Sequence, residues 1–284
     1  MIDGALVLEG GGLRTLYTSG VIDVFLENNI EFSCVIGVSA GALNAVNYIT
    51  KQVGRSVKIN LLHSYDSKFF GLRQFLTKKS VLNFDYLLKS PIEDLYPFDV
   101  KTFEESKQRL IIVATNAKTG ETAYFEEKNY DKMLQTLMAS SSAPSLSKPV
   151  TIGGQQYFDG TVSDPIPLDK AFSEGFKKVV VVRSRENSYK IDKMPSAEKI
   201  FVKAVCKKYP KLVSAHLNRP TIYNQSVEKI EKLEAEKKIF VLSPKQAFSL
   251  KAFERDARKL FRLYVQGRED AMELLPSMRE YLGQ

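Results

Sequence analysis

The stretch Cys34-Val-Ile-Gly-Val-Ser-Ala-Gly41 joins a short apolar strand to the first residues of a helix. At its centre is the pattern Gly-x-Ser-x-Gly, with Ser39 between Gly37 and Gly41. A serine on a tight strand-to-helix turn presents its hydroxyl group, and small neighbours let the turn close. The helix that opens at Ala40 offers N–H groups and a favourable dipole to a developing negative charge. The pattern therefore predicts Ser39 as a nucleophile; the alternative is a purely structural turn.

A second glycine-rich turn, Gly10-Gly-Gly12, follows the apolar run Ala5-Leu-Val-Leu8. A nucleotide-binding loop is one interpretation, but the final glycine of G-x-G-x-x-G and any G-K-[ST] are missing. Glycine amides can instead point at an oxyanion, and Arg14 adds positive potential. Two turns at the carboxyl ends of neighbouring strands share one crevice, so we expect this glycine loop to lie beside Ser39.

Ser39 needs a base to activate it, and the chain contains only two histidines. One candidate for the base is therefore a histidine, and the other is a carboxylate. His63 lies in an apolar and aromatic stretch, whereas His216 would keep the Ser-Asp-His chain order of many hydrolases. The other candidate is Asp159, which would accept the serine proton directly. Asp159-Gly160 follows a predicted strand, and the glycine permits a sharp turn that carries the carboxylate forward. An ordinary Asp-Gly turn is the structural alternative.

Strands and helices alternate over the first two thirds of the chain, which favours an α/β fold with a mostly parallel sheet. The predicted strands are 5–8, 34–36, 109–115, 122–125, 150–152, 156–158, 178–183 and 239–242. The predicted helices are 18–28, 40–49 and 130–140, with three or four amphipathic helices after Pro195. We expect an α/β domain over 1–190 and a helical, basic extension over 191–284 that packs on it.

Three motifs together resemble the patatin-like phospholipases, particularly their compact bacterial members: Gly10-Gly-Gly-Leu-Arg14, Gly37-Val-Ser-Ala-Gly41 and Asp159-Gly160. The resemblance begins at residue 5 and ends near residue 185. It implies a three-layer α/β/α sandwich and a Ser–Asp dyad that hydrolyses acyl esters of lipids. The segment 140–144 also resembles the small-residue segment that precedes the dyad aspartate in the family.

Carried over by motif, Ser39 is the nucleophile and Asp159 the general base. The oxyanion-hole and supporting positions implied by the resemblance are the amides of Gly11, Gly12 and Ala40, with Gly10, Arg14, Gly37, Gly41 and Gly160 shaping the motifs. Thr15 and Thr161 stand where the family often has glycine or a smaller residue, and Asp164 is expected to cap its loop or to flank Pro165. No cofactor, metal or calcium dependence is expected.

The function predicted is a serine lipid acyl hydrolase of the phospholipase A or esterase type. The alternative is a catalytically inactive lipid-binding or regulatory protein of the same fold. The aromatic stretch 59–88 is either core or the lining of an acyl-chain pocket.

The net charge of +8 is uneven, because residues 177–284 contain 24 basic and 13 acidic residues. This basic third either contacts an anionic membrane surface or is a solvated helical surface. No nucleic-acid partner is expected, since no RNA-binding or zinc-finger signature accompanies the charge. The chain has two cysteines, no basic-apolar leader and no apolar run of roughly 20 residues. These features predict a cytoplasmic protein, peripheral at the membrane if the basic third contacts lipid.

Overall fold

The centre of the molecule is a single sheet, which has eight strands among the residues that the structure describes. This structure, a computed structural model, describes residues 1–63, 94–144, 146–251 and 254–284. The strands are β1 (Ile2–Leu8), β2 (Phe32–Val38), β3 (Arg109–Asn116), β4 (Thr122–Glu126), β5 (Val150–Ile152), β6 (Gln155–Asp159), β7 (Val179–Val182) and β8 (Phe240–Leu242). The aromatic residues predicted within 64–88 lie outside the described residues.

Five of these strands run parallel, in the spatial order β3-β2-β1-β7-β8. β4 and β6 pair with β3 in the antiparallel direction, and β5 forms a hairpin with β6. The mostly parallel sheet predicted from the sequence is therefore confirmed. β7 illustrates the reason, because its four consecutive valines are all buried. A β-branched run of this kind suits a strand that is covered on both faces.

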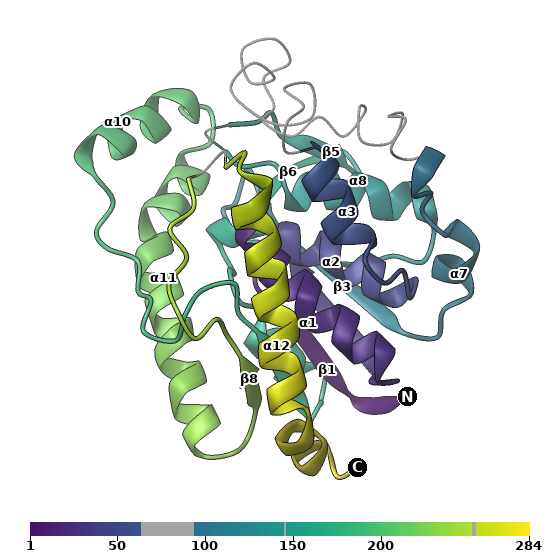
Figure 1. Cartoon of the computed structure of the whole chain (residues 1–284). Helices are drawn as coiled ribbons and strands as arrows, with labels where there is room; N and C mark the ends of the chain where they lie inside the picture. Colours follow the sequence, from purple (N-terminus) through teal and green to yellow (C-terminus); the bar gives the residue numbers. More distant parts are fainter. Residues whose placement is uncertain (64–93, 145, 252–253) are drawn as a thin grey trace.

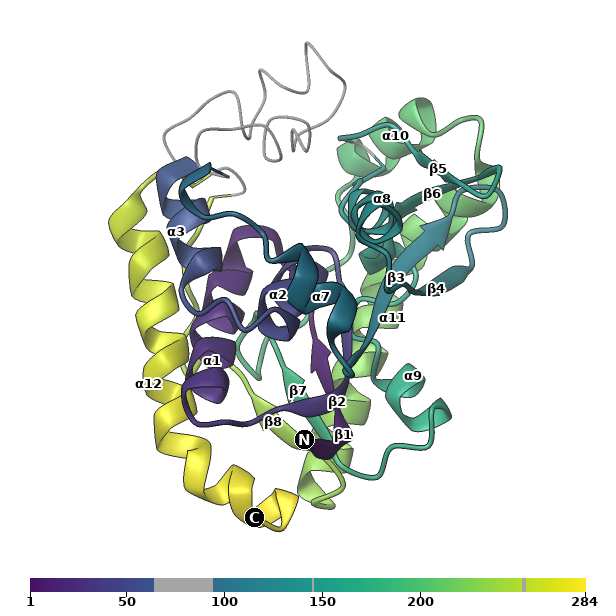
Figure 2. The same cartoon turned by 90° about the vertical axis from the view of Figure 1, so that its right-hand side faces the viewer.

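Helices cover both faces of the sheet (Figure 1 and Figure 2). The helices are α1 (Leu16–Glu27), α2 (Ala40–Ile49), α3 (Arg55–His63), α7 (Val100–Glu105), α8 (Tyr130–Ser140), α9 (Leu168–Ser173), α10 (Ser196–Val205), α11 (Pro210–Ala235) and α12 (Ala257–Leu282), with short 3₁₀ turns η1 (Gly12–Thr15) and η2 (Gly160–Val162). One hydrophobic core joins the sheet to α1, α2, α8 and α12, and a second joins its other face to α9 and α11. This arrangement confirms the three-layer α/β/α sandwich.

The region after residue 190 shares the core of the sheet. β8 extends the sheet beside β7, and α12 packs along α1, where the Tyr264 hydroxyl donates a 2.8 Å hydrogen bond to Asp23. Three helices follow Pro195 in the described residues, as predicted. The proposed division at residue 190 stays a prediction. No helix in the described ranges is both long enough and apolar enough to cross a membrane.

Some boundaries differ from the sequence-based ones. α1 begins at Leu16, two residues before the predicted start, because the turn η1 leads directly into it. α7 and α9 were not predicted, since six residues are too few to show a helical period of apolar positions. β5 and β6 are joined by a tight turn at Gly153-Gly154, and both glycines have the positive φ that such a turn requires.

Candidate active site

The register of three strands brings Ser39 and Asp159 together. On one edge of β3, Val113 pairs with Val38 at the end of β2, and the next residue, Ala114, pairs with Asp159 of β6. β6 thus pairs with the same edge of β3 as β2 does, beginning at the residue after the one where the pairing with β2 ends. Ser39 is the first residue beyond β2, so its side chain lies next to the carboxylate although 120 residues separate the two in the sequence.

Ser39 sits on a strained turn between β2 and α2. Its φ of 54° and ψ of −126° lie outside the regions that residues other than glycine prefer. The Ser39 N–H donates a 2.8 Å hydrogen bond to the Ser140 hydroxyl, and that hydroxyl donates in turn to the Val113 carbonyl at 2.6 Å. Ser140 is fully buried. It therefore fixes the strained turn to β3 from the end of α8.

The Ser39 hydroxyl donates a 2.8 Å hydrogen bond to Oδ2 of Asp159. The other oxygen, Oδ1, accepts from the Thr161 N–H at 2.8 Å, which holds the carboxylate in one orientation. Asp159 is 6% exposed. Burial raises the pKa of Asp159, and the hydrogen bonds from Thr161 and Ser39, with the positive charge of Arg219, partly offset this effect. A carboxylate with a raised pKa is a stronger base toward a serine proton.

The glycine loop lies against both members of this pair. A Cβ atom on Gly10 would stand 2.4 Å from Cγ2 of Thr161 and 3.3 Å from Cβ of Ser39, so only glycine fits. Gly12 has a φ of 57°, which also favours glycine. In the described part of the chain, the N–H groups of Gly11, Gly12 and Ala40 have no hydrogen-bond acceptor. Gly37 and Gly41 flank Ser39, and Gly160 opens η2 directly after Asp159.

Three further residues named in the sequence analysis have definite hydrogen-bond partners. The Thr15 hydroxyl donates to the Gly12 carbonyl at 2.8 Å and closes the glycine turn. Arg14 donates to the Leu250 carbonyl at 2.9 Å, which links the loop to the C-terminal region. Asp164 directly precedes Pro165, and its carboxylate accepts a hydrogen bond from the Tyr124 hydroxyl at 2.7 Å. Burial raises the pKa of Asp164 to about 6.

A buried polar network behind the glycine loop was not predicted. Glu9, the residue before Gly10, accepts hydrogen bonds from the Ser184 N–H at 2.6 Å and from the Tyr223 hydroxyl at 2.8 Å. The Ser184 hydroxyl donates to the Gly10 carbonyl at 3.0 Å. Burial raises the pKa of Glu9, against the opposing charge of the buried Arg183. The network joins the glycine loop to the end of β7 and to α11.

His216 and Arg219 lie on the inner face of α11. Four side chains share this side of the helix, because they are spaced by four, three and four residues: Leu212, His216, Arg219 and Tyr223. His216 is buried, and neither of its ring nitrogens has a partner among the described residues. Burial and the charge of Arg219 lower the pKa of His216 to about 4. The serine hydroxyl thus contacts Asp159, and His216 forms no triad with it.

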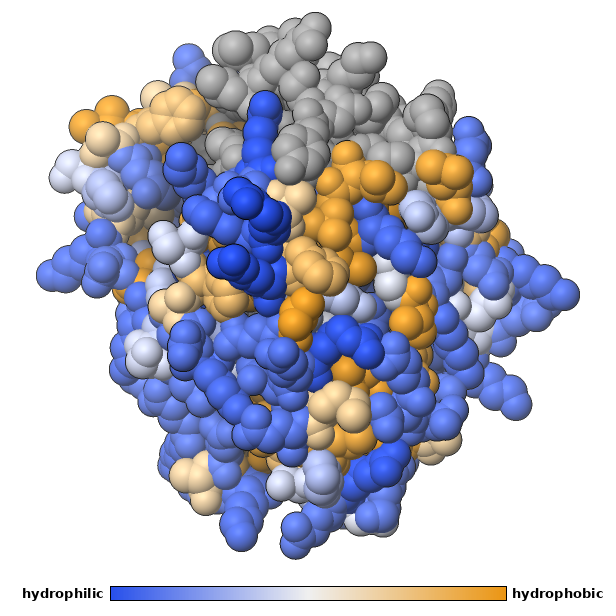
Figure 3. Space-filling model, in the orientation of Figure 1, coloured by the Kyte–Doolittle hydropathy of each residue, from blue (hydrophilic) through white to orange (hydrophobic). Residues whose placement is uncertain are grey.

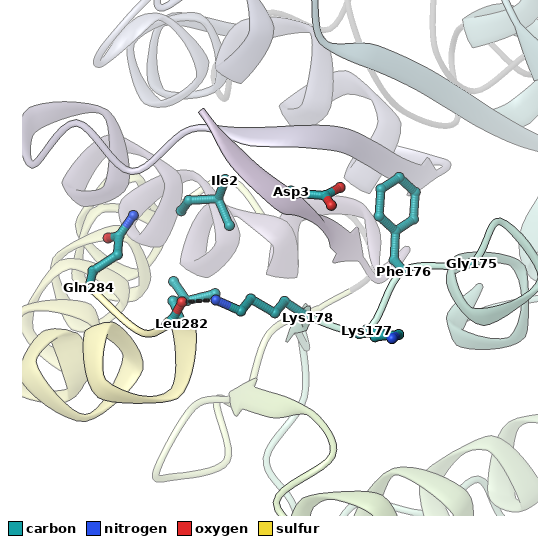
Figure 4. A pocket seen from close by; sticks show the side chains of 8 residues that line it. All are labelled: Ile2, Asp3, Gly175, Phe176, Lys177, Lys178, Leu282 and Gln284. Carbon is teal, nitrogen blue, oxygen red and sulfur yellow. Dashed lines mark hydrogen bonds between the residues drawn. The ribbon is translucent and has the colours of Figure 1, made fainter.

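A shallow depression of about 510 Å³ lies at the opposite end of β1 (Figure 4). Ile2 and Asp3 line it, and Lys178 reaches across to the Leu282 carbonyl. Ile2 is the first residue of β1, and the glycine loop follows the last residue of the same strand. At the rise of an extended strand, the two ends of β1 are about 20 Å apart. The depression is therefore separate from the serine site.

The sheet and its two glycine-bearing turns define an α/β protein in which a serine hydroxyl contacts a buried carboxylate. A family model described as patatin-like phospholipase matches residues 6–172, more than half of the sequence. The chain belongs to the patatin-like phospholipase family. A second model, for a domain of unknown function called DUF6363, matches residues 209–283.

Curated proteins similar to this chain include the following two. The uncharacterized protein YjjU of Escherichia coli (strain K12) is 29% identical over 186 residues, which are 63% of this chain and 51% of that protein. The alignment therefore covers about half of the length of YjjU. The probable lipid hydrolase 463L of Invertebrate iridescent virus 6 is 24% identical over 252 residues, 79% of this chain and 86% of that protein.

The fold is also that of a solved structure, VipD from Legionella pneumophila. The TM-score is 0.54 at 15% sequence identity, and the match covers 98% of this chain and 67% of the other. This likeness supports the fold of the chain.

Proposed function

We propose that the protein is a serine lipid acyl hydrolase in which Ser39 is the nucleophile and Asp159 the general base. One observation carries the proposal: the Ser39 hydroxyl donates directly to a buried carboxylate, at 2.8 Å, from a strained strand-to-helix turn. The unpartnered N–H groups of Gly11, Gly12 and Ala40 support an oxyanion hole beside it.

In the first half of the reaction, Oγ of Ser39 attacks the acyl carbonyl carbon while its proton passes to Asp159. The carbonyl oxygen becomes an oxyanion, which the three N–H groups stabilise at the start of α2 and in the glycine loop. Collapse of this intermediate breaks the ester bond, and the leaving alcohol takes the proton from Asp159. The acyl group then remains on Ser39.

In the second half, water gives a proton to Asp159 and attacks the acyl-enzyme. A second oxyanion forms at the same N–H groups, and its collapse returns the proton to Ser39 and releases the fatty acid. Asp159 thus exchanges every proton of the cycle, with Ser39, the leaving alcohol and water. A histidine is not needed, which agrees with the unpartnered ring of His216.

A lipid acyl ester is the proposed substrate class. The family and the name of the viral relative support it. The proposed organisation is an acyl-hydrolase domain over 1–190 and a basic extension over 191–284. We propose a cytoplasmic protein that acts at a membrane surface. An inactive lipid-binding protein of the same fold is the alternative, and reactivity of Ser39 distinguishes the two.

The test is labelling by a fluorophosphonate probe, together with turnover of a short p-nitrophenyl ester. We expect wild type to be labelled, Ser39→Ala to lose both signals, and Asp159→Asn to lose at least about 100-fold in kcat. Ser214→Ala, an exposed serine on α11, is the matched control and should behave as wild type. Unchanged labelling in Ser39→Ala would refute the assignment, and an unreactive but folded wild type would favour the lipid-binding alternative.

A further inference from the structure

Helix α10 is apolar on two opposite sides. Val202 and Cys206 pack against the protein and are 1% and 2% exposed. Ile200, Phe201 and Val205 are 69%, 46% and 49% exposed. Successive residues of a helix are rotated by 100° around its axis, so these three exposed side chains fall within an arc of about 140°. The centre of this arc lies about 150° around the axis from the centre of the buried pair. One apolar side thus anchors the helix, and the other faces outward without a partner in the described structure.

Four exposed lysines lie on α10 or directly after it. Lys199 and Lys203 lie on α10, and Lys207 and Lys208 follow its last turn. All four are exposed, and none forms an ion pair with any described residue. The acidic residue of the helix is Glu198. In Figure 3, apolar surface gathers at the upper left, where Figure 1 shows α10, next to hydrophilic surface.

α10 is attached at the edge of the fold that carries Asp159. The Cys206 thiol donates to the Pro144 carbonyl, at 3.5 Å, in the segment after α8. Cys206 also belongs to the small apolar cluster that contains Phe158 and Val162, which lie on either side of Asp159 in the sequence. Figure 2 shows α10 at the same end of the molecule as β5 and β6. Whatever α10 binds is therefore brought close to the dyad.

We propose that α10 docks the protein on an anionic lipid bilayer, with Ile200, Phe201 and Val205 inserted at the headgroup boundary. Short amphipathic helices that lie in the interface have apolar side chains on one face and lysines beside them. The four unpaired lysines attract anionic headgroups. An uncharged partner surface would gain nothing from these charges, so they favour an anionic bilayer. The inference rests on the proposed function, because docking delivers lipid esters to Ser39.

The first test is vesicle flotation with the full chain bearing Ser39→Ala, which prevents turnover. We expect binding to vesicles of mixed phosphatidylglycerol and phosphatidylcholine, and much less to phosphatidylcholine alone. Adding Ile200→Ser and Phe201→Ser should weaken binding at least about tenfold, since two apolar anchors are lost. Met272→Ser, which changes a side chain that is 52% exposed on α12, is the matched control and should not weaken it.

The second test addresses charge. Lys199→Gln with Lys203→Gln should weaken binding to the mixed vesicles, and added salt should do the same to the wild-type sequence. Lys232→Gln, an exposed lysine near the other end of α11, should have a much smaller effect. With Ser39 intact, all of these variants should hydrolyse a soluble short ester within about twofold of wild type, and only vesicle-bound substrate should be cleaved more slowly.

Vesicle binding by the Ile200→Ser, Phe201→Ser variant equal to that of wild type would overturn the proposal. Equal binding to the mixed vesicles and to phosphatidylcholine alone would overturn the proposed role of the lysines. A wild-type dimer that this variant converts to a monomer would show that a second copy covers α10 instead. Absence of ester hydrolysis in wild type would count against the proposed function alone, since flotation is measured without turnover.

Discussion

The Tyr223 hydroxyl donates a 2.8 Å hydrogen bond to Glu9, so that α11 holds the end of β1 from which the glycine loop departs. Ser184 binds the other Glu9 oxygen and the Gly10 carbonyl. The loop that would stabilise the oxyanion is thus fixed from two later parts of the chain. The C-terminal region takes part in shaping the site as well as in covering the sheet.

Tyr223→Phe should lower kcat by roughly tenfold and leave KM for a soluble ester nearly unchanged. The change removes one hydrogen bond to a buried carboxylate, worth about 1.5–3 kcal/mol, and loosens the loop that binds the transition state. Steady-state kinetics with a short p-nitrophenyl ester measure both constants. Asn224→Ala is the matched control, because Asn224 also forms two hydrogen bonds from α11, but to the backbone of Ile191. An equal loss of kcat in both variants would indicate a general effect of destabilising α11.

Ser140→Ala should weaken both stability and turnover. It removes the acceptor of the Ser39 N–H and leaves that buried group unpaired, at a cost of about 1–3 kcal/mol. The nucleophile turn is strained, so we expect kcat to fall by roughly tenfold as the turn relaxes. Ser142→Ala loses a comparable bond, to the Met138 carbonyl, without touching Ser39. Denaturant unfolding and ester kinetics on the pair separate the two effects, and unchanged kcat in Ser140→Ala would contradict the positioning role.

The two turns of the candidate site are easier to predict from the sequence than their assembly. Ser39 and Gly10-Gly-Gly12 are local strand-to-helix turns, whose residue types are sufficient to identify them. The closeness of Asp159 to Ser39 depends on β6 continuing the edge of β3 where β2 ends. Strand pairing of this kind is set by contacts between distant segments, so the residues around Asp159 do not encode it locally.

The supporting residues illustrate the same limit. Glu9 carries a visible signal, a carboxylate between an apolar strand and three glycines. Its partners Ser184 and Tyr223 lie 175 and 214 residues later, and nothing in their own neighbourhoods marks them. Ser140 stands in the small-residue segment before Asp159, but its bond to Ser39 follows from the packing of α8 on β3.

The pH dependence of turnover should reflect the environment of Asp159. The base must be ionised, so activity falls as pH drops through the pKa of Asp159, and burial raises that pKa above the ordinary value near 3.9. Arg219 lowers it through its charge. Arg219→Gln should therefore move the acid limb of kcat/KM to higher pH, and Arg219→Lys should restore it. Lys211→Gln is the control, because it also removes one positive charge from α11, at an exposed position. It should leave the pH profile of kcat/KM unchanged. A shift of the limb to lower pH in Arg219→Gln would contradict the assignment of Asp159 as the base.

His216 should make the fold sensitive to acid without contributing to catalysis. Its pKa is about 4 in the folded protein and near 6.5 when unfolded, so below about pH 6.5 the unfolded chain binds a proton that the folded chain excludes. Stability is lost as pH falls through this window, by about 2 kcal/mol between roughly pH 7 and pH 5. His216→Phe removes the imidazole and should reduce the difference between urea unfolding free energies at these two pH values. Its kcat near neutral pH should stay within about threefold of wild type, because the Ser39 hydroxyl donates to Asp159. A drop in kcat as large as that of Asp159→Asn would restore the Ser-Asp-His alternative.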